Sequence, residues 1–336
     1  MAPRKPSQDS AEDRLIARHF GPLATHPGAL GLADDAAVLA VPPTHEIVLT
    51  TDAVIAGVHF FPDDPADAVA RKALRVNLSD LAAKGAKPLG FLLSLAITKD
   101  IDDGWLKKFT AGLRADAKKF GFPLLGGDTD RTPGLVTVTI AAFGTVPRGA
   151  MVLRGGARSG DRVMVTGTIG DAALGLMLRQ DAGAARRWGL DRRMRDHLLR
   201  RLARPEPRNA IAAALRRYAH GGMDVSDGLA GDLAKMCRAA RLDAVVDVAR
   251  VPLSRAARAA LAAEPALIET ILTGGDDYEV LAAVPGRDTE RLRHAAKQAG
   301  VAITEIGRVS AGRGRARFVD REGRALEFAR PSFSHF

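Results

Sequence analysis

Apolar and polar positions in the first half of this 336-residue chain follow two different periods. Three β-branched runs predict strands: EIVLTTDAV (46–54), GFLLSLAIT (90–98) and LVTVTIAAFGTV (135–146). Between these runs, residues 65–84 and 103–120 repeat their apolar positions with helical spacing, which predicts a helix in each interval. Strands and helices therefore alternate along this half.

The second half resumes the alternation after a break. The Gly- and Arg-rich stretch 144–163 interrupts the pattern, so we expect a domain boundary near residue 148, with domains at 1–148 and 149–336. Periodicity predicts strands at 161–167, 278–284 and 302–309, and helices from Asp171 and at 208–219, 228–240 and 254–272. Periodicity by itself favours βαβ units and a parallel sheet.

The composition is that of a globular protein, with 46% apolar and 26% charged residues. No run of about 18 apolar residues is present, so a membrane partner is not expected. The N-terminal stretch MAPRKPSQDSAEDRL has no apolar core of a secretory signal. Cys237 is the single cysteine, which excludes an internal disulfide and a thiolate metal cage. The expected compartment is the cytoplasm.

The formal net charge of +10 is unevenly distributed. Residues 1–150 hold 17 basic and 17 acidic residues, so the whole surplus lies beyond them. Much of it lies in residues 185–208, which predict an amphipathic helix with an Arg-rich, solvated face before a proline-marked break. Aromatic residues make up only 5% of the chain, which argues against a nucleic-acid partner because such sites interleave aromatics with basic residues.

Several catalytic motifs are absent from the sequence. It has no G-x-x-x-x-G-K-[ST] phosphate loop, no G-x-G-x-x-G fingerprint opening a helix, no G-x-S-x-G elbow and no H-E-x-x-H zinc motif. Its eight histidines do not cluster with ligand spacing, which argues against a zinc site. Carboxylate and hydroxyl oxygens remain, and these suit hard cations such as Mg²⁺.

Aspartates recur at the ends of apolar segments, beside Gly, Ser or Thr. The five stretches are GLADDAAVL (31–39), LTTDAV (49–54), VNLSDLAAKGA (76–86), LLGGDTDR (124–131) and GMDVSDGLAGD (222–232). Two carboxylates 4 Å apart repel by about 4 kcal/mol at an effective dielectric of 20, so a convergent cluster requires cations. Alternatively, each aspartate is a helix cap or a turn residue, and any single stretch is compatible with that interpretation.

The order of the motifs is more specific than any one of them. The chain contains, in sequence, GLADDAAVL, LTTDAVIAGVHF, KALRVNLSDLAAKGAKP, LLGGDTDRT, LRGGARSGDRVMVTGTIGDAALGL, MDVSDGLAGDL and LTGGDDYEVL. This series resembles the thiamine-monophosphate kinases, a family in the superfamily of aminoimidazole-ribotide synthetase and selenophosphate synthetase. The resemblance extends from about residue 14 to the C-terminus.

The resemblance implies an α+β fold with two domains, like that of aminoimidazole-ribotide synthetase. It implies an N-terminal domain whose mixed sheet pairs with its copy in a homodimer, and a C-terminal α/β domain that completes the cleft for ATP and substrate. The implied reaction is phosphorylation of thiamine monophosphate by ATP to thiamine diphosphate, by direct in-line transfer with several Mg²⁺ ions. The acceptor is itself an anion, so the metals would reduce charge repulsion between the two substrates.

The resemblance also implies roles for individual residues. The family's metal-binding positions correspond to Asp35, Thr50, Thr51, Asp52, Asp80, Asp128, Asp224 and Asp227, of which Asp52, Asp80 and Asp128 are the implied catalytic residues. Its nucleotide contacts correspond to Gly127, Asp128, Arg154 and Ser226, and its thiamine phosphate contacts to His59 and Asp276. A lone histidine beside two phenylalanines is also compatible with a structural role for His59.

Two positions depart from the family pattern. Ala33 replaces a glycine beside the first acidic pair. Arg330 occupies the position of an aromatic residue that commonly stacks on the substrate pyrimidine. A guanidinium can stack on a ring, so Arg330 is a candidate substrate contact, with Phe328 or Phe333 as alternatives.

Other functions within the superfamily leave different signatures. A ligase related to ribotide synthetase is the main alternative, since it would use ATP on another small substrate. A selenophosphate synthetase would have a reactive cysteine near the N-terminus, and a carbamoyl-transfer maturation factor would have one at the C-terminus; this chain has neither. A non-enzymatic basic binding protein would show salt-sensitive affinity for nucleic acid and no turnover.

Overall fold

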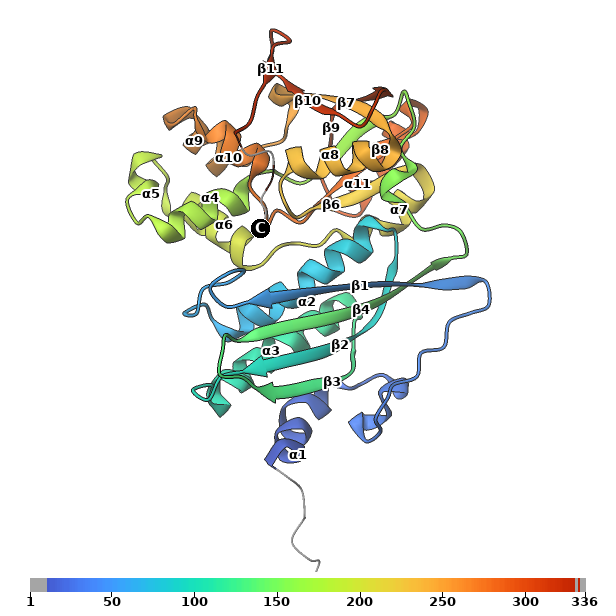
Figure 1. The fold of residues 1–336 in the computed structure, drawn as a ribbon, viewed down its shortest axis with the longest axis vertical. Coiled ribbons are helices and arrows are strands. Elements are labelled where there is room, and N and C mark those ends of the chain that lie inside the picture. Colours follow the sequence, from blue (N-terminus) through green and yellow to red (C-terminus); the bar gives the residue numbers. More distant parts are fainter. Residues whose placement is uncertain (1–10, 330–331, 333–336) are drawn as a thin grey trace, which may run out of the picture. The chain divides into compact units, whose positions relative to one another are not determined.

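The computed structural model describes residues 11–329 and residue 332, whose fold is shown in Figure 1. The chain divides into two compact units that are not continuous in sequence. Unit 1 comprises the described parts of Met1–Val41, Leu49–Leu74 and Pro88–Phe143. Unit 2 comprises the described parts of Pro42–Val48, Arg75–Lys87 and Gly144–Phe336.

A four-stranded sheet in the order β1-β4-β2-β3 lies mostly in unit 1. Its strands are β1 (His45–Ile55), β2 (Lys87–Ile97), β3 (Leu124–Arg131) and β4 (Thr137–Pro147). The three strands predicted in this half are confirmed. The fourth, β3, is formed by the LLGGDTDR stretch and pairs in parallel with β2.

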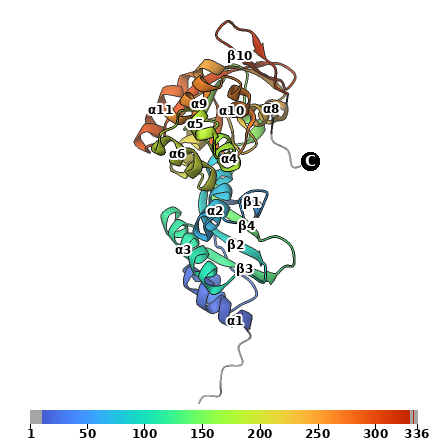
Figure 2. The same cartoon turned by 90° about the vertical axis from the view of Figure 1, so that its left-hand side faces the viewer.

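Two 18-residue helices, α2 (Ala66–Ala83) and α3 (Asp103–Phe120), cover one face of this sheet, as Figure 2 shows. Both were predicted from apolar spacing. Helix α3 begins where the Asp102 carboxylate accepts a 2.7 Å hydrogen bond from the Trp105 amide, and it ends before the left-handed Gly121. The shorter N-terminal elements are α1 (Ala11–Leu15), η1 (Ile16–Phe20), η2 (Gly21–Leu23) and η3 (Pro27–Leu32).

Unit 2 contains a seven-stranded sheet in the order β11-β10-β7-β9-β5-β8-β6. Its strands are β5 (Arg162–Thr166), β6 (Gly221–Val225), β7 (Leu242–Asp247), β8 (Glu279–Val284), β9 (Ile303–Ala311), β10 (Ala316–Val319) and β11 (Ala325–Leu326). Strands β10 and β7 are parallel, whereas β5 is antiparallel to β8 and β9. The parallel sheet favoured by periodicity is therefore wrong, and the α+β class is confirmed.

The helices of unit 2 surround this sheet. They are α4 (Asp171–Gln180), α5 (Ala184–Arg187), α6 (Arg192–Ala203), α7 (Ala212–Tyr218), α8 (Leu229–Ala240), α9 (Arg255–Ala263), α10 (Leu267–Thr273) and α11 (Thr289–Gln298), with short turns η4 (Arg154–Gly156), η5 (Asn209–Ile211), η6 (Val248–Arg250) and η7 (Gly286–Asp288). None of the helices in the described chain has the length and apolarity of a membrane span.

Two long helices predicted in unit 2 are each broken in the structure. The Arg-rich stretch is divided between α5 and α6, because Gly189 adopts a left-handed conformation and Asp191 caps a new helix start. The helix predicted at 254–272 is divided between α9 and α10. Pro265 lies at that break, where it can neither donate a backbone hydrogen bond nor follow a helical residue without a clash.

Alternating side chains of the central strands fill a separate hydrophobic cluster on each face of the seven-stranded sheet. Val163 and Val165 of β5 pack in one cluster, and Met164 packs in the other. Every residue of β8 is buried, including the charged Glu279. A buried carboxylate such as that of Glu279 needs hydrogen-bonding partners to offset the cost of its burial.

Candidate functional site

Strand β1 carries three of the predicted metal-binding residues near its middle. Successive side chains on a strand point to opposite faces, so Thr50 and Asp52 share one face and Thr51 lies on the other. Thr51 and Asp52 are exposed, and Thr50 is half-buried. Their oxygens are therefore not sealed inside the core of unit 1.

Gly127 and Asp128 lie on β3, the edge strand opposite β1 in the order β1-β4-β2-β3. A Cβ atom on Gly127 would lie 1.9 Å from the carbonyl oxygen of Leu93, so the close approach of β3 to β2 requires glycine here. Asp128 is exposed, and its carboxylate accepts a 2.9 Å hydrogen bond from the Thr129 amide. The sheet thus places Asp52 and Asp128 on non-adjacent strands.

Asp35 is exposed in the loop after η3. The residues before it, Leu30, Gly31 and Leu32, all have left-handed φ angles, of 51°, 66° and 59°. Ala33 has a φ of −100°, which any residue adopts. The alanine that replaces the family's glycine therefore introduces no backbone strain beside Asp35.

His59 closes a turn at the end of β1. Its ring Nδ1 atom accepts a 3.1 Å hydrogen bond from the Ile55 amide. Its carbonyl oxygen accepts a 2.7 Å hydrogen bond from the Lys72 ammonium, which is buried in α2. These bonds give His59 a structural role, and its contact with substrate stays a prediction.

In unit 2, four charged side chains share one electrostatic environment. Lys84 follows Asp80 by one helical turn, and its ammonium donates a 2.9 Å hydrogen bond to the carbonyl oxygen of Gly222 on β6. Burial lowers the pKa of Lys84, as does the Arg154 guanidinium, whereas Asp224 and Asp80 raise it. The charges of Asp80, Asp224 and Arg154 therefore all act on the Lys84 ammonium.

The second half of α2, which carries Asp80, is anchored within unit 2. The buried Arg75 guanidinium donates 3.0 Å hydrogen bonds to the carbonyl oxygen of Pro205 and to the Glu206 carboxylate. The Asn209 side chain donates a 3.0 Å bond to the carbonyl oxygen of Leu78. These contacts fix the direction in which this end of the helix presents Asp80.

The turn η4 presents Arg154 beside β6. The Gly222 amide donates a 3.1 Å hydrogen bond to the carbonyl oxygen of Leu153. A Cβ atom on Gly156 would lie 2.1 Å from the carbonyl oxygen of His220, so the turn packs against backbone. Arg154 itself is exposed, which leaves a forked donor accessible to phosphate oxygens.

Ser226, Asp227 and Asp276 lie in two loops that contact each other through their backbones. The Asp276 amide donates to the carbonyl oxygen of Ser226, and the Tyr278 amide to that of Val225, both at 2.8 Å. Asp276 and Tyr278 have left-handed φ angles of 71° and 51°, which such tight approach imposes. The predicted nucleotide residue Ser226 and the predicted substrate residue Asp276 thus lie in loops that are joined by backbone hydrogen bonds.

Lys235 on α8 contacts two carboxylates. Its ammonium donates to Asp227, a predicted metal ligand, and lies 2.8 Å from the Oδ1 atom of the buried Asp232. Burial lowers the pKa of Lys235, but its bonds to Asp227 and Asp232 outweigh this and raise it.

The sequence interpretation overlooked both Lys84 and Lys235. The sequence signal for both is spacing: Lys235 follows Asp232 by three residues, and Lys84 follows Asp80 by four. Such spacing places opposite charges on one helical face.

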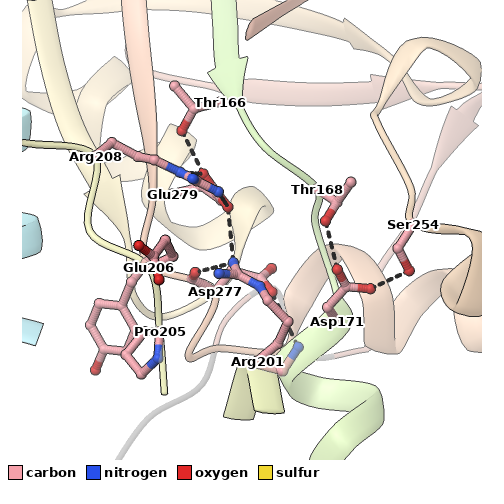
Figure 3. A network of polar contacts seen from close by, with 12 residues as sticks. Thr166, Thr168, Asp171, Arg201, Pro205, Glu206, Arg208, Ser254, Asp277 and Glu279 are labelled. Carbon is pink, nitrogen blue, oxygen red and sulfur yellow. Dashed lines mark hydrogen bonds and ion pairs between the residues drawn. The ribbon is translucent and has the colours of Figure 1, made fainter. Parts of the chain in front are cut away.

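Figure 3 shows a buried polar network at the start of β8, which the sequence interpretation also overlooked. The Glu279 carboxylate, with an exposure of 0%, accepts hydrogen bonds from Arg201 at 2.9 Å, Arg208 at 2.6 Å and Thr166 at 2.6 Å. Burial lowers the pKa of Arg208, but the contact with Glu279 raises it above its ordinary value. Glu279 is therefore the counter-ion for two arginines, of which Arg201 lies in α6 and Arg208 in the loop that follows it.

Asp277 connects the same loop to helix α4. Its carboxylate accepts hydrogen bonds from the amides of Gly170 at 2.6 Å and Ala172 at 3.3 Å, while Arg201 donates to its carbonyl oxygen at 2.7 Å. Burial raises the pKa of Asp277 to about 8, against the lowering effects of Arg201 and the Gly170 amide. Asp277 and Glu279 thus hold the loop that presents Asp276.

Asp171 fixes the start of α4 in this network (Figure 3). Its carboxylate accepts hydrogen bonds from Ser254 at 2.5 Å and Thr168 at 2.6 Å, and it contacts the His197 ring at 2.9 Å. Burial raises the pKa of Asp171, but these contacts outweigh burial and lower it. The carboxylate therefore stays ionised and holds α4 in place.

The structure gives no contact for two of the three candidate stacking residues. Arg330 and Phe333 lie outside the described residues. Phe328 packs edge-on against Phe318 of the core, with ring centroids 5.5 Å apart. The Phe328 ring is therefore engaged in core packing, and the identity of the stacking residue stays a prediction.

Two family models match the chain: AIR synthase related protein, N-terminal domain, over residues 33–146, and its C-terminal domain over residues 158–320. A thiamine-monophosphate kinase of Caulobacter vibrioides is 43% identical over 303 residues, which cover 89% of this chain and 84% of that relative. The chain belongs to the thiamine-monophosphate kinase family.

Solved structures agree with this family membership. The crystal structure of thiamine-monophosphate kinase from Stenotrophomonas maltophilia K279a matches with a TM-score of 0.81 and 34% identity, covering 94% of this chain and 96% of that one. AaThiL complexed with AMPPCP and TMP matches with a TM-score of 0.74 and 27% identity, covering 97% and 94%. The fold implied by the thiamine-monophosphate kinase motifs is confirmed.

Proposed function

We propose that this protein transfers the γ-phosphoryl group of ATP to thiamine monophosphate, giving thiamine diphosphate and ADP. The proposal rests on one observation above others, the 43% identity to a thiamine-monophosphate kinase across 89% of the chain. AaThiL, a structural relative, is complexed with AMPPCP and TMP. The electrostatics of unit 2 support the proposal, because the charges of Arg154, Asp80 and Asp224 all act on the Lys84 ammonium.

The residues present have the chemistry that Mg²⁺ requires. In the described chain, no single group of three or more His, Cys, Asp or Glu side chains is gathered as a metal site. The charges of Asp80 and Asp224 nevertheless both act on one cation, the Lys84 ammonium. Mg²⁺ bound to such carboxylates would neutralise charge on the phosphates. We assign the metals to Asp35, Thr50, Thr51, Asp52 and Asp128 of unit 1 and to Asp80, Asp224 and Asp227 of unit 2.

We propose direct in-line transfer, with Asp52, Asp80 and Asp128 as the catalytic carboxylates. The acceptor is a phosphate oxygen that is already ionised, so it needs little help from a general base. A sulfur nucleophile is disfavoured because burial raises the pKa of Cys237 to about 11, which leaves almost no thiolate at neutral pH. Arg154, Ser226 and Gly127 would hold the nucleotide phosphates.

The acceptor would bind at the loop that carries Asp276. Thiamine phosphate has a cationic thiazolium ring, and the Asp276 carboxylate supplies the opposite charge. The two buried anchors of this loop, Asp277 and Glu279, keep that carboxylate in a fixed place. We retain His59 and Arg330 as further substrate contacts.

The proposed assembly is a homodimer formed by the four-stranded sheet. Val48 of β1 is buried, whereas its neighbours Ile47 and Leu49, which point to the opposite face of the strand, are 42% and 66% exposed. Apolar side chains on an open sheet face favour association with a second copy. The proposed compartment is the cytoplasm, where ATP is available.

Product analysis tests this function. Purified protein is incubated with ATP, Mg²⁺ and thiamine monophosphate, and the products are separated by liquid chromatography. Equal amounts of ADP and thiamine diphosphate are expected, with no ADP when thiamine replaces its monophosphate. ADP without thiamine diphosphate would indicate another acceptor, as in a ribotide-synthetase-like ligase, and no ADP at all would overturn the proposal.

A further inference from the structure

Two lysines of unit 2 lie where relatives of this chain are expected to bind metal, and the function proposed above assigns no role to either. Lys84 follows Asp80 by four residues, and its ammonium bonds the carbonyl oxygen of Gly222, two residues before Asp224 on β6. Lys235 bonds Asp227 and Asp232. Each lysine therefore accompanies one pair of carboxylates, and three of these four carboxylates are predicted metal ligands.

Lys84 is a half-buried cation. Burial is the largest influence on its pKa and lowers it, and the neighbouring Arg154 acts in the same direction. The bond to the Gly222 carbonyl uses one of the three ammonium hydrogens and holds the charge next to β6, the strand that carries Asp224. The charges of Asp80 and Asp224 act in the opposite direction and favour the charged amine.

Lys235 is held more directly. The Asp232 side chain, with an exposure of 0%, lies 2.8 Å from the Lys235 ammonium and accepts a 2.9 Å hydrogen bond from the Asp227 amide. Burial raises the pKa of Asp232, because the surrounding protein disfavours its charge. Without Lys235, a buried carboxylate and a predicted ligand carboxylate would face each other unneutralised.

We propose that Lys84 and Lys235 are internal counter-cations that stand in for divalent metal in the metal-free protein and thereby lower the affinity of the acidic residues for that metal. This proposal rests on the metal-binding role assigned above to Asp80, Asp224 and Asp227. In the absence of metal, each ammonium offsets the repulsion within its carboxylate pair. A divalent ion that binds must then act against a positive charge that is already present.

Two physical consequences distinguish this role from simple packing. Replacing either lysine with methionine keeps the side-chain length but removes the charge, so the folded state should lose stability when no metal is present and regain it when metal binds. The same change removes repulsion between two cations, so divalent metal should bind more tightly. A lysine that only fills space would lower stability equally with and without metal.

The test compares Lys84→Met and Lys235→Met with wild type in the absence of nucleotide. Mn²⁺ binding is measured by electron paramagnetic resonance, and thermal unfolding is followed in EDTA and at saturating Mg²⁺. We expect the Mn²⁺ dissociation constant to fall at least ~5-fold in each variant. The melting temperature should fall in EDTA and recover in Mg²⁺. Lys84→Arg and Lys235→Arg should stay close to wild type, as should Lys87→Met, which removes an exposed lysine of the same segment.

Three outcomes would overturn the proposal: unchanged Mn²⁺ affinity, a melting temperature lowered equally in EDTA and Mg²⁺, or a methionine variant that stays unfolded at saturating Mn²⁺. Because nucleotide and thiamine phosphate are absent, these readouts do not depend on turnover. A protein that shows the expected metal response but makes no thiamine diphosphate would overturn the proposed function only. A protein that makes thiamine diphosphate without this response would overturn the role of the lysines only.

Discussion

The backbone amide of Asp276 donates a 2.8 Å hydrogen bond to the carbonyl oxygen of Ser226. This bond joins the loop proposed to bind the acceptor to the loop proposed to bind the nucleotide. A Cβ atom on Gly275 would lie 2.5 Å from the same carbonyl oxygen, so the joint tolerates no side chain there. The loops proposed to bind the two substrates are thus joined through their backbones.

The first prediction concerns the charge on Asp276. Asp276→Asn keeps a residue that tolerates the left-handed backbone but removes the carboxylate. The KM for thiamine phosphate should rise ~10-fold or more, while the KM for ATP changes little, because binding to one substrate is lost. Steady-state kinetics with each substrate varied in turn measures both constants. Equal changes in the two constants, or no change in either, would place the acceptor site elsewhere.

The second prediction concerns the catalytic carboxylates. Asp52→Asn and Asp80→Asn should each lower kcat at least ~100-fold, because an amide oxygen is a weaker ligand for the phosphate-bridging metal. Circular dichroism should show an unchanged fold. Asp100→Asn, which changes an exposed loop aspartate, is the matched control and should retain full activity. Wild-type rates in Asp80→Asn at saturating Mg²⁺ would contradict the metal assignment.

The third prediction concerns stability at the start of β8. Glu279→Gln keeps the side-chain shape but leaves Arg201 and Arg208 without a buried counter-ion, so the free energy of unfolding should fall by about 3–5 kcal/mol. Urea denaturation measures this loss. Glu322→Gln removes an ion pair with Arg324 whose side chains are 64% and 75% exposed, so its effect should stay below about 1 kcal/mol. Similar losses of unfolding free energy in both variants would mean that burial of Glu279 does not increase the contribution of its ion pairs to stability.

Much of unit 1 could be predicted from sequence because its signals are local. Apolar spacing gave α2 and α3, and β-branched runs gave β1, β2 and β4. Strand β3 was overlooked because its LLGGDTDR sequence is rich in Gly and Asp, which are rare in strands; its pairing with β2 overrides that preference. The strand order is set by contacts distant in sequence, which no local pattern records.

The candidate site, like the fold, could be predicted only in part. The motif series implied metal-binding roles for Asp80 and Asp224, but it could not show that their charges act on Lys84. Glu279 likewise gave no local signal, because its partners Arg201 and Arg208 are more than 70 residues away. Buried polar networks are specified by tertiary packing, so the sequence contains the residues of a network but does not show which of them bond to each other.

The fourth prediction concerns Cys237, which is buried in α8. Because its pKa is raised to about 11, the thiol should react slowly with iodoacetamide at pH 8. Cys237→Ala should keep near wild-type kcat, since no proposed step uses sulfur, and should lose roughly 1 kcal/mol of stability through the small cavity. Mass spectrometry of alkylated protein and the kinase assay check both points. A folded but inactive variant would reveal an unrecognised thiol chemistry.

The last prediction uses the carboxyl group of Asp277, whose pKa burial raises to about 8 in the folded protein. The ordinary pKa of an aspartate is about 3.9, so between these values the folded state binds more protons at this position than the unfolded state does. Stability from this group is therefore fully present below about pH 4 and is lost as the pH rises, by up to about 1.4 kcal/mol per pH unit, until the folded group ionises near pH 8. Asp277→Asn resembles the neutral form and does not titrate. The unfolding free energy of wild type, measured by urea denaturation from pH 5 to pH 9, should therefore decline relative to that of the variant and level off above pH 8. Parallel curves would show that the Gly170 and Ala172 amides and Arg201 keep this carboxylate ionised throughout, and the loop would then be held by a charge at all of these pH values.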